Sequence, residues 1–159
     1  MSSVGYKVDT SAAVALSAAT ARTALMVITP AQFGGCLTHM TLGFNGVTAS
    51  AVPVFWEIVR STNASNSTPG TGNTTESANI VQIRGRSITT GFTAFSASTS
   101  EPTVLTRLDG NLLTPAGGLL VYDFPLGREL ECDVSAGLGV RLTAPATVNA
   151  RVSVQFERL

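Results

Sequence analysis

Few residues of this chain have the types and spacing that chemistry requires. His39 is the only histidine, and it lies opposite the apolar face of its predicted strand. A serine or cysteine nucleophile would need this histidine as its base, and no Gly-x-Ser-x-Gly motif accompanies it. A metal site would need further ligands at matching spacing, and none stands beside His39. We therefore expect neither an enzyme nor a protein that holds a metal or a cofactor.

Charged residues gather at two places. Glu129, Glu131 and Asp133 alternate with apolar residues, which places three carboxylates on one face of a predicted strand. A calcium loop would also supply backbone carbonyls and a sharp glycine turn, and this alternation lacks both. Arg84 and Arg86 form the densest basic spot, but nucleic-acid binding would need more positive charge and interleaved aromatics. We predict that in a self-assembling trimer or lattice these arginines reach the acidic strand of a neighbour.

Composition favours a protein built from strands, in one domain over residues 1–159. Charged residues make up 13%, against a usual value of ~25%, and 15 Ser and 21 Thr supply polar groups instead. The net charge of zero argues against nucleic acid as a partner. Polar residues interrupt the apolar stretch 12–28 and no basic region precedes it, so neither a signal peptide nor a membrane span is predicted.

Alternation of apolar and polar residues predicts the strands. It runs through 138–144 and again through 147–157, and we predict that these two strands form an antiparallel hairpin across Pro145. Alanine in 12–24 favours a helix, but the alternation there predicts two short strands. Eight or more short strands and no convincing helix predict an all-β, single-domain antiparallel β-sandwich or barrel, with a jelly roll as the preferred topology.

The remaining signals concern burial and turns. Cys36 is expected to share the buried face of its strand with Met40, and Cys132 is expected to be buried as well. Both would be reduced thiols, although a single bridge stays open. The run 24–28 predicts a strand buried on both faces, and residues 109–110 (Asp-Gly) predict a turn.

Two segments are expected at the surface. The polar stretch 61–77, with Glu76 as its single charge, is too long for an ordinary connection and predicts a long surface loop. Residues 2–9 predict an extended arm that could add a strand to a neighbour. Trp56 is predicted as a core anchor, whereas Phe55 points to the opposite face and is a candidate for a subunit contact.

Four segments carry a resemblance to a known family. They are 19–25, which leads into an apolar strand, 40–54 with Glu57 following, 125–130, and 139–150. In these turns and strand pairs the chain resembles a β-sandwich protein found among the virion structural genes of tailed bacteriophages, particularly those that infect actinobacteria. Together the segments span most of the chain outside 61–77.

The resemblance implies a capsid decoration (cement) protein, a trimer that bridges major capsid subunits on the outside of the phage head. Its partners would be the major capsid protein and its own copies, with no nucleic acid and no membrane, after synthesis in the host cytoplasm. The alternative is a tail, head-fibre or baseplate component that binds host carbohydrate. The candidate residues for contacts with the capsid or with other subunits are Val4, Tyr6, Lys7, Val8, Phe55, Arg84, Arg86, Glu129, Glu131 and Asp133.

Overall fold

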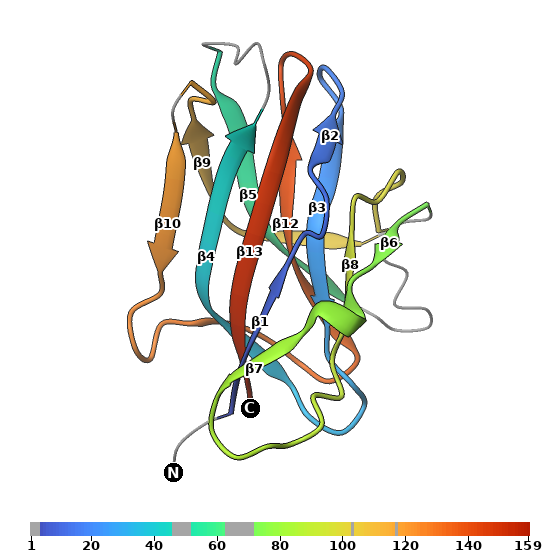
Figure 1. The fold of residues 1–159 in the computed structure, drawn as a ribbon, viewed down its shortest axis with the longest axis vertical. Coiled ribbons are helices and arrows are strands. Elements are labelled where there is room, and N and C mark those ends of the chain that lie inside the picture. The colour runs from blue at the N-terminus through green and yellow to red at the C-terminus, as the bar shows by residue number, and fades with distance from the viewer. Residues whose placement is uncertain (1–3, 46–51, 63–71, 103, 117) are drawn as a thin grey trace.

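The computed structural model describes residues 4–45, 52–62, 72–102, 104–116 and 118–159. These residues form thirteen β-strands and one short 3-10 helix, η1 (Ser77–Asn79). The strands build two antiparallel sheets that pack face to face (Figure 1). This architecture confirms the predicted all-β sandwich, while the jelly-roll order within it stays a prediction.

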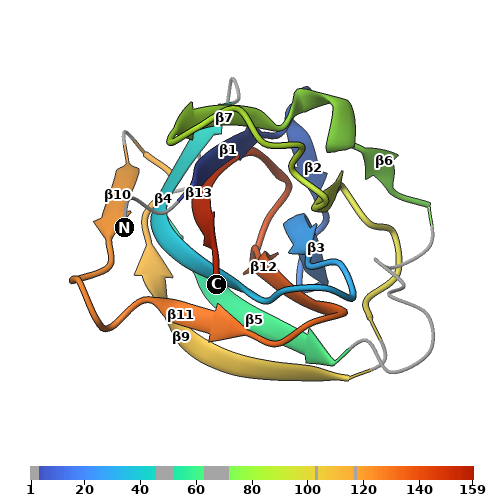
Figure 2. The same ribbon diagram turned by 90° about the horizontal axis from the view of Figure 1, so that it is seen from below.

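The two sheets share one core, and Figure 2 shows them curving around it when the molecule is seen from below. The seven-stranded sheet has the order β10 (Leu119–Asp123), β4 (Gly35–Asn45), β13 (Val148–Arg158), β1 (Gly5–Asp9) and β7 (Val81–Arg84), with β11 (Leu130–Cys132) on β4 and β2 (Val14–Leu16) on β13. The six-stranded sheet has the order β6 (Thr74–Thr75), β8 (Thr93–Ser96), β3 (Ala21–Ile28), β12 (Ala136–Thr143), β5 (Val54–Thr62) and β9 (Leu105–Leu113). Strands β2 and β3 confirm that 12–24 is not a helix.

The core is formed by the alternating inner faces of the long central strands. Val152 and Val154 of β13 face Val140 and Leu142 of β12 across the sandwich, and all four are buried. Each such side chain stabilises the fold by about 1.5–3 kcal/mol on burial. A second, smaller cluster on the outer face of the six-stranded sheet buries Met26 with its neighbours, which confirms that 24–28 is covered on both faces.

The predicted hairpin between the last two strands is wrong. Strand β12 pairs with β3 and β5 in one sheet, whereas β13 pairs with β1, β2 and β4 in the other. The connection through Pro145 therefore crosses from sheet to sheet. Such a sheet-to-sheet connection turns the apolar faces of both strands toward the same core. The alternation of apolar and polar residues is therefore the same as in a hairpin, and it does not distinguish the two arrangements.

The predicted turn at 109–110 is also wrong, because these residues lie inside β9. The register between β5 and β9 shifts at Ile58 and Val59, so the longer β9 segment is accommodated as a bulge. Gly110 permits this close pairing: a Cβ atom there would lie 2.7 Å from the carbonyl oxygen of Trp56.

Residues 2–9 do not form a free arm in the described part of the chain. Strand β1 pairs with β13 on one side and β7 on the other, so both of its edges are occupied. Tyr6 and Val8 are buried in the core, and Val4 packs against it. The strand-adding arm is therefore wrong, and Tyr6 and Val8 are core residues and not contact residues. Val4 and Lys7 stay predicted contact residues; Lys7 points outward and forms an ion pair with Asp9 at 3.2 Å.

The polar stretch 61–77 is only partly a loop. Its first two residues belong to β5 and residues 74–75 form β6, while 63–71 lie outside the described residues. Glu76, the single charge of the stretch, is fully buried rather than exposed. The end of the segment is thus a packed part of the sandwich.

Candidate interaction surface

Strand β4 organises the outer face of the seven-stranded sheet. A register shift against β13 makes Thr38 an extra residue, so that Leu37 and Met40 both face the core. Cys36 and His39 consequently share the outer face with their partners on β13. The prediction that Cys36 shares a face with Met40 is wrong for this reason, while the outward position of His39 is as expected.

A row of residues crosses five strands at one level of this face. Arg84 of β7, Gly5 of β1, Glu157 of β13, Cys36 of β4 and Glu131 of β11 are consecutive register partners. We call these residues the charged row. The sequence predicted an acidic spot and a basic spot at separate places in the chain. The register brings Arg84 and Glu131 onto the same outer face of the seven-stranded sheet.

The arginine of the charged row is engaged within its own chain. Because Gly5 has no side chain, the guanidinium of Arg84 extends across β1 and forms an ion pair with Glu157, which is largely buried. Arg84 is thus paired within its own chain, and its contact with a neighbour's carboxylates stays a prediction. Arg86 lies beyond the end of β7 and is exposed.

The thiol of Cys36 is buried in the middle of the charged row. Burial raises its pKa to about 11, with the Glu129 and Glu131 carboxylates adding to the effect and Arg84 opposing it. A reactive cysteine needs the opposite environment, since only the thiolate attacks. Burial likewise raises the pKa of Cys132 to about 11, and the two cysteines are free thiols, as predicted.

One level along β4, His39 is paired with the edge strand. Its Nδ1 atom lies 2.5 Å from Oδ1 of Asp123, its register partner on β10. Together with Arg84, Gln155 and Glu157 they line a shallow depression. Among the described residues no serine, threonine or cysteine side chain is hydrogen-bonded to His39.

The acidic strand is shorter than predicted. Strand β11 covers only 130–132, and Glu131 is its one outward carboxylate. Glu129 and Asp133 flank it, the first half-buried and the second exposed. Val134, the apolar residue that follows Asp133 in the alternating run, is exposed because the strand has already ended.

Phe55 lies on the other side of the molecule. It is half-buried on the outer face of the six-stranded sheet, with the guanidinium of Arg107 at 5.7 Å from its ring centre. The ten candidate contact residues do not form one surface. Tyr6 and Val8 lie in the core with Val4 packed against it, only Arg84 and Glu131 belong to the charged row, and Phe55 lies on the opposite sheet. The other four, Lys7, Arg86, Glu129 and Asp133, lie on or near the outer face of the seven-stranded sheet.

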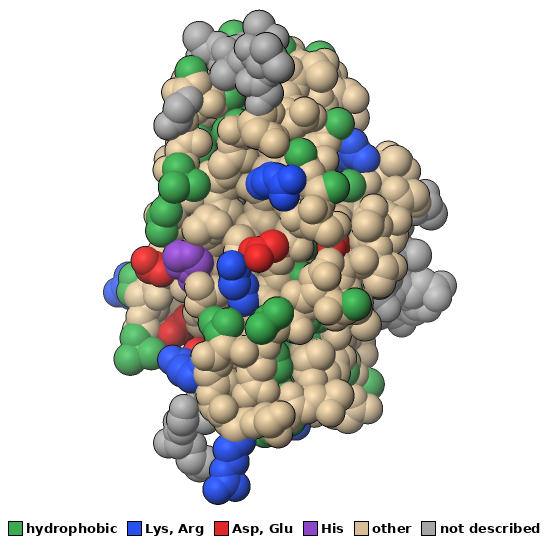
Figure 3. All heavy atoms as spheres, viewed as in Figure 1, with side chains coloured by type: hydrophobic (Ala, Val, Ile, Leu, Met, Phe, Trp, Pro, Cys, Tyr) green, Lys and Arg blue, Asp and Glu red, His purple; other side chains and the backbone are tan. Residues whose placement is uncertain are grey.

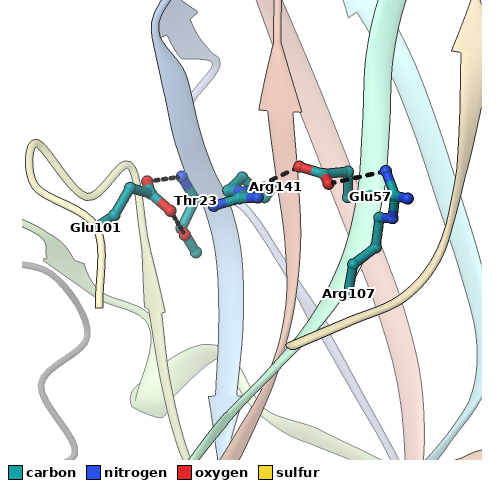
Figure 4. Close-up of polar contacts among 5 residues, drawn as sticks. All are labelled: Thr23, Glu57, Glu101, Arg107 and Arg141. Carbon is teal, nitrogen blue, oxygen red and sulfur yellow. Dashed lines mark hydrogen bonds and ion pairs between the residues drawn. The ribbon is translucent and has the colours of Figure 1, made fainter. Parts of the chain in front are cut away.

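The outer face of the six-stranded sheet carries a polar cluster that the sequence did not reveal (Figure 4). Glu57 on β5 is buried and accepts a hydrogen bond from Nε of Arg141 at 2.8 Å, with Arg107 at 3.8 Å. Beside it, the Glu101 carboxylate accepts hydrogen bonds from the backbone and hydroxyl of Thr23. Thr23, Glu57 and Arg141 occur in the polar phase of their strands, but only the register identifies them as neighbours. Glu101 lies in the connection between β8 and β9.

Large apolar side chains are exposed at both edges of the seven-stranded sheet. One group, the β7 strip, consists of Val81, Ile83 and Ile88; the other, the β10 strip, consists of Leu119, Val121 and Leu126. Leu126 is 97% exposed. Figure 3 shows apolar side chains along the left edge and in the lower part of this face, with charged side chains in its middle and also at its left edge and lower end.

In the described part of the chain, no group of three or more His, Cys, Asp or Glu side chains is placed to hold a metal ion. No helix among the described residues has the length and apolar character needed to span a membrane. Comparison of the chain with protein-family models, with curated proteins and with solved structures found no match.

Proposed function

We propose that this chain is a virion structural protein that decorates the outside of a tailed-phage capsid and stabilises it by bridging capsid subunits. The observation that carries the proposal is the pair of exposed apolar strips at opposite edges of one sheet. Apolar patches on a soluble surface mark contacts with other proteins. A bridging protein needs at least two such contacts, and the β7 and β10 strips provide them.

The distribution of charge supports the same function. The ion pairs Lys7–Asp9, Arg84–Glu157 and Arg141–Glu57 are each made within one chain. Charges that are already compensated need no partner, and interface centres are generally poor in unpaired charge. The low charge content and the resemblance of four segments to decoration proteins point in the same direction.

The polar groups of the charged row do not favour catalysis. The Cys36 thiol is held protonated at neutral pH by its raised pKa, and the cavity between Cys36, Cys132 and Phe92 measures only about 10 Å³. That volume holds at most one water molecule. A rigid sandwich with contact surfaces at its edges is better suited to assembly than to turnover.

Co-sedimentation with phage heads tests the proposal. The probe is a panel of heads from tailed actinobacteriophages that have been stripped of their decoration protein. We expect saturable binding to heads of at least one phage, and a loss of about tenfold or more in affinity for Ile83→Glu, which puts a charge into the β7 strip. Ser153→Glu, on the same sheet face but outside both strips, is the control. Binding no stronger than that of an unrelated β-sandwich protein would refute the proposal.

A further inference from the structure

The edge of the seven-stranded sheet at β10 has open hydrogen-bonding positions. The amide of Phe124 donates to the carbonyl oxygen of Thr38 at 3.1 Å, which extends the register of β10 against β4. In an antiparallel ladder the backbone groups of alternate residues point to the same side. Those of Leu120 and Tyr122 therefore point toward β4, as Phe124 does.

The backbone groups of Leu119, Val121 and Asp123 consequently point away from β4. Among the described strands, β4 is the only one that pairs with β10. Open groups of this kind are satisfied by an extended chain that lies alongside, not by a helix or a small ligand. The chemistry of the edge thus specifies a β-strand as the occupant.

The side chains of β10 specify which kind of strand fits. Leu119 and Val121 are exposed on the outer face, and Leu120 and Tyr122 are only partly buried on the inner face. A strand placed beside them must therefore be apolar on both faces. The opposite edge strand, β7, has Gln82 on its inner face and does not meet this requirement.

We propose that β10 pairs with β10 of a second copy of this chain, joining the two seven-stranded sheets through a two-fold axis at Val121. Residues 119–122 complement themselves, because they are apolar on both faces, and only Asp123 at the end of the strand is charged. Val121 lies opposite Val121 of the copy, Leu120 lies opposite Tyr122, and Leu119 lies opposite Asp123. Asp123 keeps its carboxylate on His39 of its own chain.

Three features make this edge suited to pairing. Natural sheets protect open edges with lysine, proline or a bulge, and residues 119–122 contain neither residue and pair with β4 in an unbroken register. The two-fold pairing forms about six backbone hydrogen bonds. It also covers the exposed β10 strip, including Leu126 in the following turn.

The strength of the pairing follows from its size. A strand of five residues with one flanking turn covers less than the ~800 Å² per partner of a standard interface. We therefore expect a dissociation constant of about 10–100 µM and a dimer whose population depends on concentration. This pairing rests on the fold and not on the proposed capsid function, and it differs from the trimer that the resemblance implies. Because it occupies the β10 strip, the capsid contacts of a dimer would be the two β7 strips, one on each copy.

Sedimentation equilibrium between about 5 µM and about 500 µM tests the pairing, since this range brackets the expected constant. The wild-type chain should shift from one to two times its 16.4 kDa mass. Val121→Lys and Val121→Glu should each remain monomeric, because the two-fold axis places like charges opposite each other. An equimolar mixture of the two variants should recover the dimer. Val81→Lys, the same substitution on the other edge strand, should dimerise like the wild type.

Several outcomes would overturn the pairing. They are a wild-type monomer at the highest concentration, a trimer, a Val121→Lys dimer of unchanged strength, or a mixture that stays monomeric while the wild type dimerises. Fluorescence of Trp56 verifies that each variant is folded. Binding to phage heads is measured in a separate experiment. A protein that dimerises but does not bind heads would count against the proposed capsid function and would still support the pairing of β10 with β10.

Discussion

Replacing Glu76 by glutamine should destabilise the fold more than any change of a surface carboxylate. The Glu76 side chain is fully buried. Its Oε1 atom accepts hydrogen bonds from Ser96 Oγ at 2.5 Å and from the backbone amide and hydroxyl of Ser11, and Oε2 accepts one from Asn79 Nδ2 at 2.6 Å. The carboxylate thereby connects the segment before β2, η1 and β8.

Glutamine replaces this carboxylate poorly. If its oxygen faces Ser11 and Ser96, its amide nitrogen faces Asn79, whose side-chain amide must turn over to present its oxygen as an acceptor; if glutamine is turned over, its nitrogen meets the backbone amide of Ser11, which can only donate. A buried polar group without a partner costs about 1–3 kcal/mol, and hydrogen bonds to a charged group are stronger than neutral ones. We expect Glu76→Gln to lower the free energy of unfolding by about 2–3 kcal/mol and the melting temperature by about 5–10 °C.

The effect should depend on pH in a defined direction. Burial raises the pKa of Glu76, but the hydrogen bonds from Ser96, Ser11 and Asn79 outweigh it and hold the pKa below its usual value. A carboxyl group with a lowered pKa in the fold stabilises above its unfolded pKa, and this stabilisation is lost as the pH falls through the folded pKa. The difference between wild type and Glu76→Gln should therefore shrink at acidic pH.

Urea denaturation followed by the fluorescence of Trp56, the single tryptophan, measures the effect. Glu131→Gln is the matched control, because Glu131 is exposed, and it should change stability by less than about 0.5 kcal/mol. The reasoning would be refuted if Glu76→Gln changed the free energy of unfolding by less than about 0.5 kcal/mol. It would also be refuted if the difference in stability between wild type and Glu76→Gln stayed constant from neutral to acidic pH.

Three further predictions concern the backbone and the thiols. Gly110→Ala should lower stability by about 1–3 kcal/mol, because its Cβ would lie 2.7 Å from the carbonyl oxygen of Trp56; thermal unfolding measures this. Ala19→Gly should raise stability by about 0.5 kcal/mol, since Ala19 has a φ of 56° that glycine adopts without strain; urea titration measures it. Cys36 and Cys132 should resist Ellman's reagent at pH 8 until the protein unfolds, because burial raises both pKa values to about 11.

Periodicity predicted the strands well because it reports the face of each residue. The run 147–157 coincides with β13 to within one residue at either end, and 24–28 is buried on both faces as its apolar character indicates. The periodicity of a strand does not indicate, however, which other strands it pairs with. The strands on either side of Pro145 alternate perfectly and yet belong to different sheets.

The candidate surface was harder to predict, since it depends on single-residue shifts in register. Cys36 alternates with Met40 as if both faced the core, and one extra residue at Thr38 reverses its direction. That reversal turns Cys36 outward, between Glu157 and Glu131. No property of the residues themselves marks the position of such a bulge.

The buried carboxylates were also not predicted, because their burial depends on residues of other strands. Glu76 stands in a stretch whose composition is that of an exposed loop, and it is buried because Ser11 and Ser96, far away in the chain, supply donors. Glu57 is buried because Arg141 is its register partner on the adjacent strand, β12. A carboxylate is stable inside a protein only where donors surround it, and in a sandwich those donors arrive through long-range pairing. The residues that could not be predicted are therefore those whose environment is supplied entirely by other strands.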